Sequence, residues 1–180
     1  FSPRSMLHDI VKAFGIPSFT AVVTASIIAG MSQGMVQALI IYTGTYFFEL
    51  SPNQMTFLFT GGVVGVVSGT LLTRPLSTIF KEKKHLYIAG HCWYAIFTSY
   101  VIILRLLDLL PPNSDPIIAP LYIISGTISG IGLGAAIPLT SSMIADVTDE
   151  HERRYKRRQE GIYYAAASFA GKAIGGSGAI

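Results

Sequence analysis

The positions of the charged residues constrain this chain more than any other feature. Of its 13 Lys and Arg residues, 11 fall into three short clusters, which are Arg4 with Lys12, the segment from Arg74 to Lys84, and the segment from Arg153 to Arg158. Between the clusters lie apolar stretches of about 20 residues or more, long enough to cross a hydrocarbon core. Only 13% of the residues are charged, about half the share in a soluble domain. This pattern excludes a soluble domain, a disordered chain and a nucleic-acid-binding protein, and it predicts an integral membrane protein.

The apolar stretches predict an all-α membrane protein with five transmembrane helices. Segments this long and apolar are typical of helices rather than barrel strands, because a helix pairs all its backbone groups internally. The expected spans cover about residues 19–48, 55–73, 86–107, 117–144 and 161–180. The first is long enough that it should tilt or extend beyond the bilayer. Because the chain begins with Phe1 and stops at Ile180 inside an apolar run, we interpret it as a fragment of a longer polypeptide.

The loop charges predict the orientation in the cell membrane. The N-terminal segment and the 74–84 and 153–158 loops are basic, whereas the 49–54 and 108–116 loops contain no Lys or Arg. Alternation of this kind is what the positive-inside rule requires of successive crossings. The net charge of +3 is therefore an orientation signal, and the N-terminus is predicted to be cytoplasmic.

Glycines recur four residues apart in two of the expected spans. They are Gly61, Gly65 and Gly69 in the second span, and Gly126 and Gly130 in the fourth. This spacing places them on one helix face, where small residues let two backbones approach closely. Close helix packing is therefore expected at these positions.

No metal or cofactor site is expected. Cys92 is the only cysteine, so neither a disulfide framework nor a thiolate metal site can be built. The four histidines never share a helix face with a second metal ligand. We interpret His91 as a packed neutral imidazole, and Arg105 as a snorkelling side chain paired with Asp108 at i+3.

Lys172 is the most unusual charge. It lies 11 residues beyond Gly161, which puts it about 16 Å deep, near the bilayer midplane. Two interpretations remain open, a structural ion pair or a lysine that lines a polar cavity for a solute or coupling ion. None of the ten acids lies at mid-depth, so its partner belongs to another part of the polypeptide or is a bound species.

The segment ADVTDEHERRYKRRQEG places acids and bases densely beside the membrane. Asp146, Asp149 and Glu150 are expected to end one helix, five cations follow, and Glu160 opens the next span. The charges are either a solubilising, topology-setting loop or ion pairs that break and form during a conformational cycle. A lipid phosphotransferase would need a longer Asp- and Gly-rich motif, and only Asp146 and Asp149 fit it. The protein is therefore not expected to be an enzyme.

The stretch from Ala145 to Lys172 resembles a known connection between two membrane helices. It is similar to the tenth-to-eleventh helix connection of the glycoside–pentoside–hexuronide:cation symporters, the melibiose-permease-like family of the major facilitator superfamily. The matching elements are Ala145–Asp149, Arg158–Gly161 and Lys172, and TRPLSTIFKEKK resembles the family's basic eighth-to-ninth connection. The resemblance implies that the five spans are helices seven to eleven of a twelve-helix transporter. The twelfth helix and the N-terminal bundle of the same polypeptide would then lie outside these 180 residues.

The resemblance also implies a function and its residues. The family couples uptake of a sugar or related solute to Na⁺, H⁺ or Li⁺, with its cation-binding carboxylates mainly in the N-terminal half. Lys172 and Ser168 match positions near the solute and cation sites. Asp146, Asp149 and Arg158 match charges that form cytoplasmic ion pairs.

Together these observations predict the C-terminal part of a secondary active transporter that takes up a sugar by alternating access. Lys172, Ser168, Gln33 and Gln37 are expected to line the cavity, with Na⁺ or H⁺ as the coupling ion. Asp146, Asp149, Arg153 and Arg158 are expected to form the cytoplasmic gate. A lysolipid transporter of the same fold and a non-transporting structural membrane subunit are the alternatives. Gln33 and Gln37, polar at mid-depth, favour the sugar.

Overall fold

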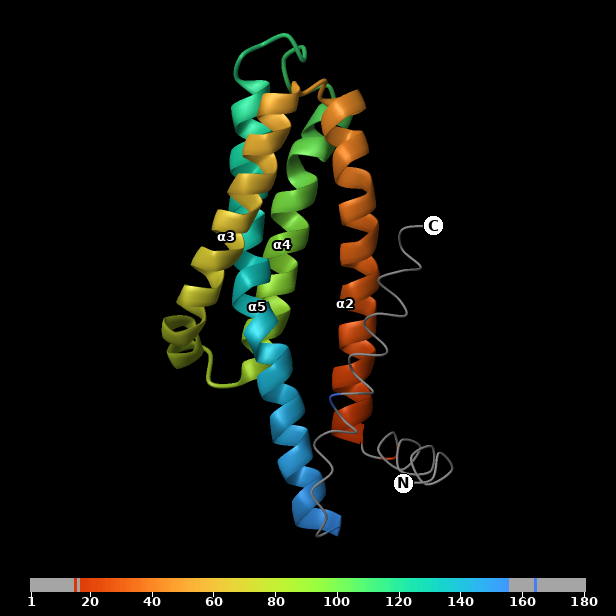
Figure 1. Ribbon diagram of the computed structural model, residues 1–180, viewed down its shortest axis with the longest axis vertical. Helices are drawn as coiled ribbons and strands as arrows, with labels where there is room; N and C mark the ends of the chain where they lie inside the picture. The colour runs from red at the N-terminus through yellow and green to blue at the C-terminus, as the bar shows by residue number, and fades with distance from the viewer. Residues whose placement is uncertain (1–14, 16, 156–163, 165–180) are drawn as a thin grey trace. The chain divides into compact units, whose positions relative to one another are not determined.

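The chain is all-helical over the part described by the computed structural model, which comprises residues 15, 17–155 and 164 (Figure 1). Its elements are α2 (Pro17–Tyr42), a short π-helix η1 (Thr43–Phe47), α3 (Pro52–Ile79), α4 (Lys83–Leu106) and α5 (Ile118–Tyr155). Four segments among the described residues are long and apolar enough to cross a membrane, namely Pro17–Phe47, Pro52–Ile79, Lys83–Leu106 and Ile118–Glu150. The predicted all-α membrane architecture is confirmed. The expected fifth span, 161–180, lies outside the described residues apart from Tyr164.

Two helices are longer than the apolar spans predicted. α3 continues beyond residue 73 to Ile79, and α5 continues beyond residue 144 to Tyr155. Hydropathy marks the part of a helix that lies in lipid, whereas helical hydrogen bonding continues into water. The expectation that Asp146 and Asp149 end a helix was wrong, because both lie within α5.

The start of α3 is fixed by a capping box. The Ser51 backbone N–H donates to the Gln54 Oε1 at 2.8 Å, and the Gln54 N–H donates to the Ser51 Oγ at 3.4 Å. Pro52 occupies the first helical position, where a missing N–H costs nothing. The capping box therefore fixes where the chain leaves the segment after η1 and enters α3.

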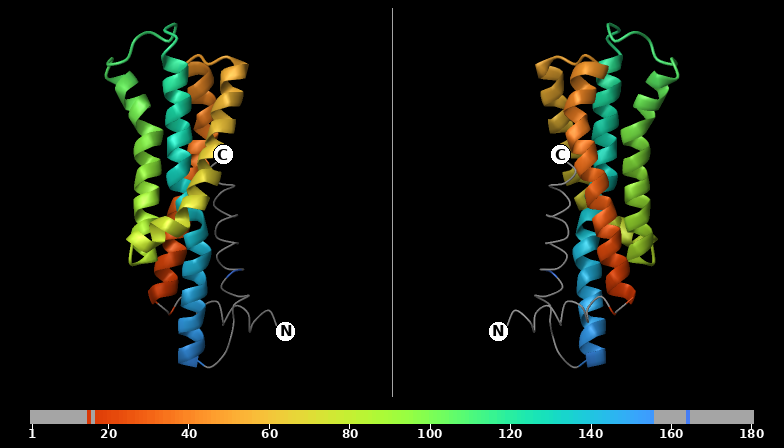
Figure 2. Two further views of the ribbon diagram at one scale, coloured as in Figure 1. Left: turned by 90° about the vertical axis from the view of Figure 1, so that its left-hand side faces the viewer. Right: turned by 90° about the vertical axis from the view of Figure 1, so that its right-hand side faces the viewer.

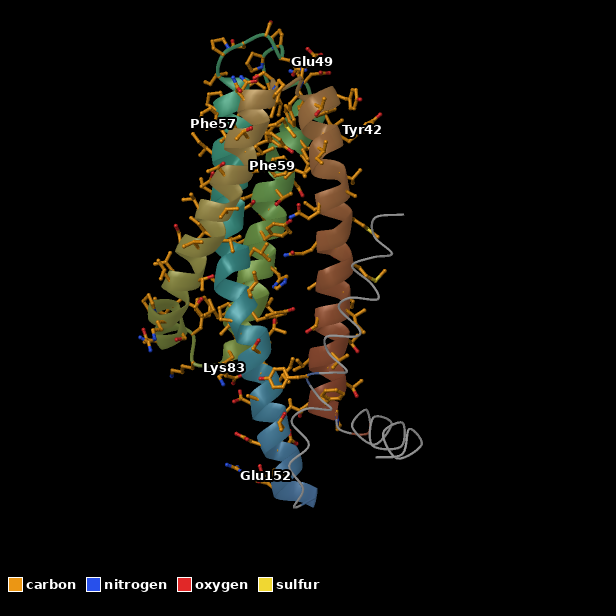
Figure 3. All side chains as sticks on the ribbon, viewed as in Figure 1. Tyr42, Glu49, Phe57, Phe59, Lys83 and Glu152 are labelled. Atoms are coloured by element: carbon orange, nitrogen blue, oxygen red, sulfur yellow. The ribbon has the colours of Figure 1, made fainter. Side chains whose placement is uncertain are left out.

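The structure divides into two compact units, and one comprises Leu39–Leu139. Within it, α3 and α4 both lie alongside the first part of α5 (Figures 1 and 2). Its core lies near the 48–50 and 108–117 loops and contains seven buried residues: Phe48, Leu50, Leu58, Val101, Ile118, Ala119 and Tyr122. Glu49 and Lys83 lie at opposite ends of this unit (Figure 3), as expected for loops on opposite sides of a membrane.

Close packing of α5 against α3 and α4 depends on glycine. A Cβ added at Gly65 would meet the Thr127 carbonyl oxygen, and one added at Gly134 would meet the Val66 carbonyl oxygen, both closer than real Cβ contacts allow. At Gly90, an added Cβ would lie 2.6 Å from the Gly132 carbonyl oxygen. The expected packing role is confirmed for all five predicted glycines, since an added Cβ would be crowded at each of Gly61, Gly65, Gly69, Gly126 and Gly130. It extends to Gly90 and Gly134, which the four-residue spacing did not single out.

The loop between α4 and α5 is held by polar contacts. The Arg105 guanidinium donates to the Leu110 carbonyl at 3.4 Å and to that of Pro111. The Asn113 Nδ2 donates to the Phe47 carbonyl at 2.9 Å. The expected pairing of Arg105 with Asp108 was wrong: among the described residues the guanidinium binds loop carbonyls instead, because the chain turns back over it.

The other unit comprises Phe1–Ala38 and Thr140–Ile180. In its described part, the first turns of α2 pack on the last turns of α5 through Phe19, Val23, Ile144 and Val147. The Tyr164 hydroxyl donates to the Ser141 carbonyl at 3.1 Å.

Candidate functional site

One face of α2 is apolar at both ends and polar in the middle. Residues spaced three and four apart share a helix face, and on this face they are Phe19, Val23, Gly30, Gln33, Gln37, Ile40 and Gly44. Phe19 and Val23 are buried at one end. Ile40 packs against a second core at the other end, where Gly44 is buried. The face therefore points toward protein at both ends, and we call it the inward face.

Gln33 and Gln37 occupy the middle of the inward face. Gln33 is half-buried, Gln37 is exposed, and both lie in the 31-residue span Pro17–Phe47. Neither amide is hydrogen-bonded within the described residues. A Cβ added at Gly30 would meet no atom within 4 Å there. Each amide offers two N–H donors and a carbonyl acceptor without carrying a charge, so the pair is suited to bind hydroxyl groups.

The end of α5 carries the expected gate residues. Asp146, Asp149 and Arg153 are exposed on one side of the helix, and Val147 and Thr148 are buried on the other. Arg153, expected in a loop, lies in the last turns of α5. Its neighbour in the sequence, Glu152, is labelled in Figure 3. Asp149 and Arg153 are one turn apart, yet they form no ion pair within the described residues.

Three of the predicted site residues lie outside the described residues. They are Arg158, Ser168 and Lys172, and their roles in the gate and the cavity stay predictions. The coupling ion, Na⁺ or H⁺, likewise stays a prediction.

The loop between α3 and α4 is basic and exposed. The Lys84 ammonium donates to the Glu82 carboxylate, with 2.6 Å between Nζ and Oε2. This hydrogen bond and the positive charge lower the pKa of Glu82 below its usual value. Both side chains are more than half exposed, so the pair contributes little to stability.

No group of three His, Cys, Asp or Glu residues in the described part of the chain is placed to hold a metal ion. His91 instead donates from Nδ1 to the Tyr87 carbonyl at 3.0 Å and packs against the Tyr87 ring. Its expected role as a packed histidine is confirmed.

Comparison with known proteins decides the family. The family described as "MFS/sugar transport protein" matches residues 2–180. The chain belongs to this family. It is therefore a multi-pass membrane protein of the major facilitator superfamily, as the sequence predicted, and a domain of a transporter family. No match was found among curated proteins or among solved structures.

The inward face of α2 was not recognised from the sequence as a whole. Gln33 and Gln37 stood out as polar residues at mid-depth, but the face they share with Phe19, Val23 and Ile40 did not. Its three- and four-residue spacing is a signal that would have revealed it.

Proposed function

We propose that the chain is the C-terminal bundle of a cation-coupled sugar transporter of the glycoside–pentoside–hexuronide:cation type. The observation that carries this proposal is the polar middle of the inward face, where two uncharged amides form no hydrogen bond within the described residues and lie near the middle of the span Pro17–Phe47. An amide left unpaired in lipid is costly, and a bound solute would satisfy both of these amides. A sugar offers hydroxyl groups that both donate to and accept from an amide.

The N-terminal bundle of the same polypeptide would supply the other wall of the cavity. In alternating access, one bundle rocks against the other around a site near the midplane. Lys172 and Ser168 would complete the cavity next to Gln33 and Gln37, and Na⁺ or H⁺ would drive uptake. The N-terminus would face the cytoplasm of the cell, because the basic loops lie on that side.

Uptake by the full-length protein in liposomes tests this proposal. Gln33→Leu and Gln37→Leu should each raise the KM for the sugar about 3- to 10-fold, because a lost hydrogen bond is worth about 0.5–1.5 kcal/mol. The matched control is Ser32→Ala on the same helix. Ser32 is exposed and its hydroxyl donates to the Ile28 carbonyl of its own helix at 2.9 Å.

Two results would contradict the proposal. Uptake of a lysolipid, and of no sugar, would identify the protein as a lysolipid transporter instead. If correctly inserted protein takes up no solute in a cation-dependent way, the protein is better explained as a structural membrane subunit that does not transport.

The charges at the end of α5 should act on rate rather than on binding. Asp149→Asn should slow maximal uptake about 5- to 150-fold with little change in KM, because a gate pair worth about 1–3 kcal/mol biases the conformational equilibrium without touching the solute. Glu49→Gln, in the short segment before α3, removes the same charge and should leave uptake near normal. A rise in KM at unchanged maximal rate would assign Asp149 to the solute site instead.

A further inference from the structure

Pro138 interrupts the hydrogen bonding of α5. Proline has no N–H, so the carbonyl four residues earlier, that of Gly134, receives no helical hydrogen bond. Gly134 is buried. An unpaired carbonyl is costly where water has no access, so another donor is required.

That donor comes from α3. The Thr70 Oγ1 lies 3.1 Å from the Gly134 carbonyl oxygen and 3.0 Å from the Val66 carbonyl oxygen of its own helix. A hydroxyl has one hydrogen to donate, and the Val66 carbonyl already accepts the Thr70 backbone N–H of the helix. The carbonyl with no other donor is that of Gly134, so it gains more from the bond.

A second threonine repeats the arrangement one turn further along α3. The Thr73 Oγ1 lies 3.3 Å from the Ala135 carbonyl oxygen and 3.2 Å from that of Gly69. Ala135 is the next residue after Gly134, in the turn that the Pro138 ring crowds. Two hydroxyls of α3 therefore meet two successive carbonyls of the interrupted turn.

The packing of α5 changes at the same place. Residues up to Leu139 belong to the unit that contains α3 and α4, and residues from Thr140 belong to the other unit. Ile144 and Val147 then pack on Phe19 and Val23 of α2. The helix thus lacks one backbone hydrogen bond shortly before its packing partners change, and prolines are a common cause of helix bending.

We propose that Gly134–Pro138 is a hinge in α5, and that the hydroxyls of Thr70 and Thr73 form a latch that holds one of its conformations. Bending at this hinge changes the direction of the last turns of α5, which carry Asp146 and Asp149. The part of this inference that concerns transport depends on the proposed function. The hinge and latch themselves do not.

Hydrogen exchange of the full-length protein in lipid nanodiscs, without solute, tests the latch. Thr70→Val with Thr73→Val keeps the branched shape and removes both hydroxyls. We expect amide exchange in the 139–143 segment to accelerate about 5- to 150-fold, since the two bonds are each worth about 0.5–1.5 kcal/mol. Thr70→Ser with Thr73→Ser keeps the hydroxyls and should leave exchange near normal.

Thr60→Val is the matched control. Its hydroxyl donates at 2.8 Å to the Thr56 carbonyl of its own helix, so its removal should leave exchange in the 139–143 segment unchanged. Unchanged exchange in the Thr70/Thr73 valine variant would overturn the latch.

A double-mutant cycle that combines Pro138→Ala with the Thr70/Thr73 valine pair tests whether the latch depends on the missing N–H of Pro138. Alanine restores an N–H that can donate to the Gly134 carbonyl, so the valine pair should then change exchange less than about 2-fold. Equal acceleration with and without Pro138 would show that the threonines only pack the helices, and would overturn the hinge. Because no solute is present, either result is independent of sugar uptake.

Discussion

Replacing Lys172 with alanine in the full-length protein should abolish cation-coupled accumulation of the solute and leave expression and membrane insertion intact. An ionised lysine near the midplane costs about 2.5–3.5 kcal/mol even on the mildest scale, so its removal eases insertion. The sequence predicts none of the ten acids at mid-depth, so we expect the partner of Lys172 to be a carboxylate of the N-terminal bundle. Without the ammonium that carboxylate would bind protons more tightly, and coupling to the cation would fail.

Two further variants sharpen this result. Lys172→Arg should restore uptake poorly, because a planar guanidinium does not fit a cavity shaped around a compact ammonium. Lys84→Ala removes a cation that is exposed and paired with Glu82, and it should transport normally. Normal coupled uptake by the alanine variant would show that Lys172 is only a tolerated charge.

The membrane-crossing helices could be predicted from the sequence because the cost of charge in lipid dominates the pattern. In the sequence, Arg74 and the cluster from Arg153 to Arg158 predict where the chain leaves the hydrocarbon core. The helix ends could not be predicted in this way. Hydrogen bonding continues through Arg74 and Asp146, because a charged residue in water does not stop a helix.

The polar contacts between segments could not be predicted from the sequence either. Asp108 is three residues from Arg105, and local spacing favoured their pairing, yet the guanidinium binds carbonyls of a loop that folds back over it. Pro138 is visible in the sequence as an interruption of a helix. Its partner Thr70 is 64 residues from Gly134, and only the packing of α3 on α5 brings them together.

The glycine positions were predicted best, because close packing in lipid has few solutions other than small residues. The sequence alone does not tell which glycines are crowded and which are open. Gly62 lies next to Gly61 in α3, yet a Cβ added to it would meet no atom within 4 Å among the described residues. At Gly134 the same atom would meet the backbone of Val66.

Alanine substitutions at these glycines should therefore have opposite signs. Gly134→Ala forces a methyl group against the Val66 backbone, which cannot move aside as a flexible side chain would. We expect this overpacking to lower the free energy of unfolding by about 1–3 kcal/mol. The melting temperature in detergent or nanodiscs should fall by about 2–10 °C. Gly62→Ala should leave the melting temperature unchanged or raise it, because alanine is more favourable than glycine in a helix by about 1 kcal/mol. Equal stability of the two variants would mean that α3 and α5 do not approach through Gly134 in the membrane.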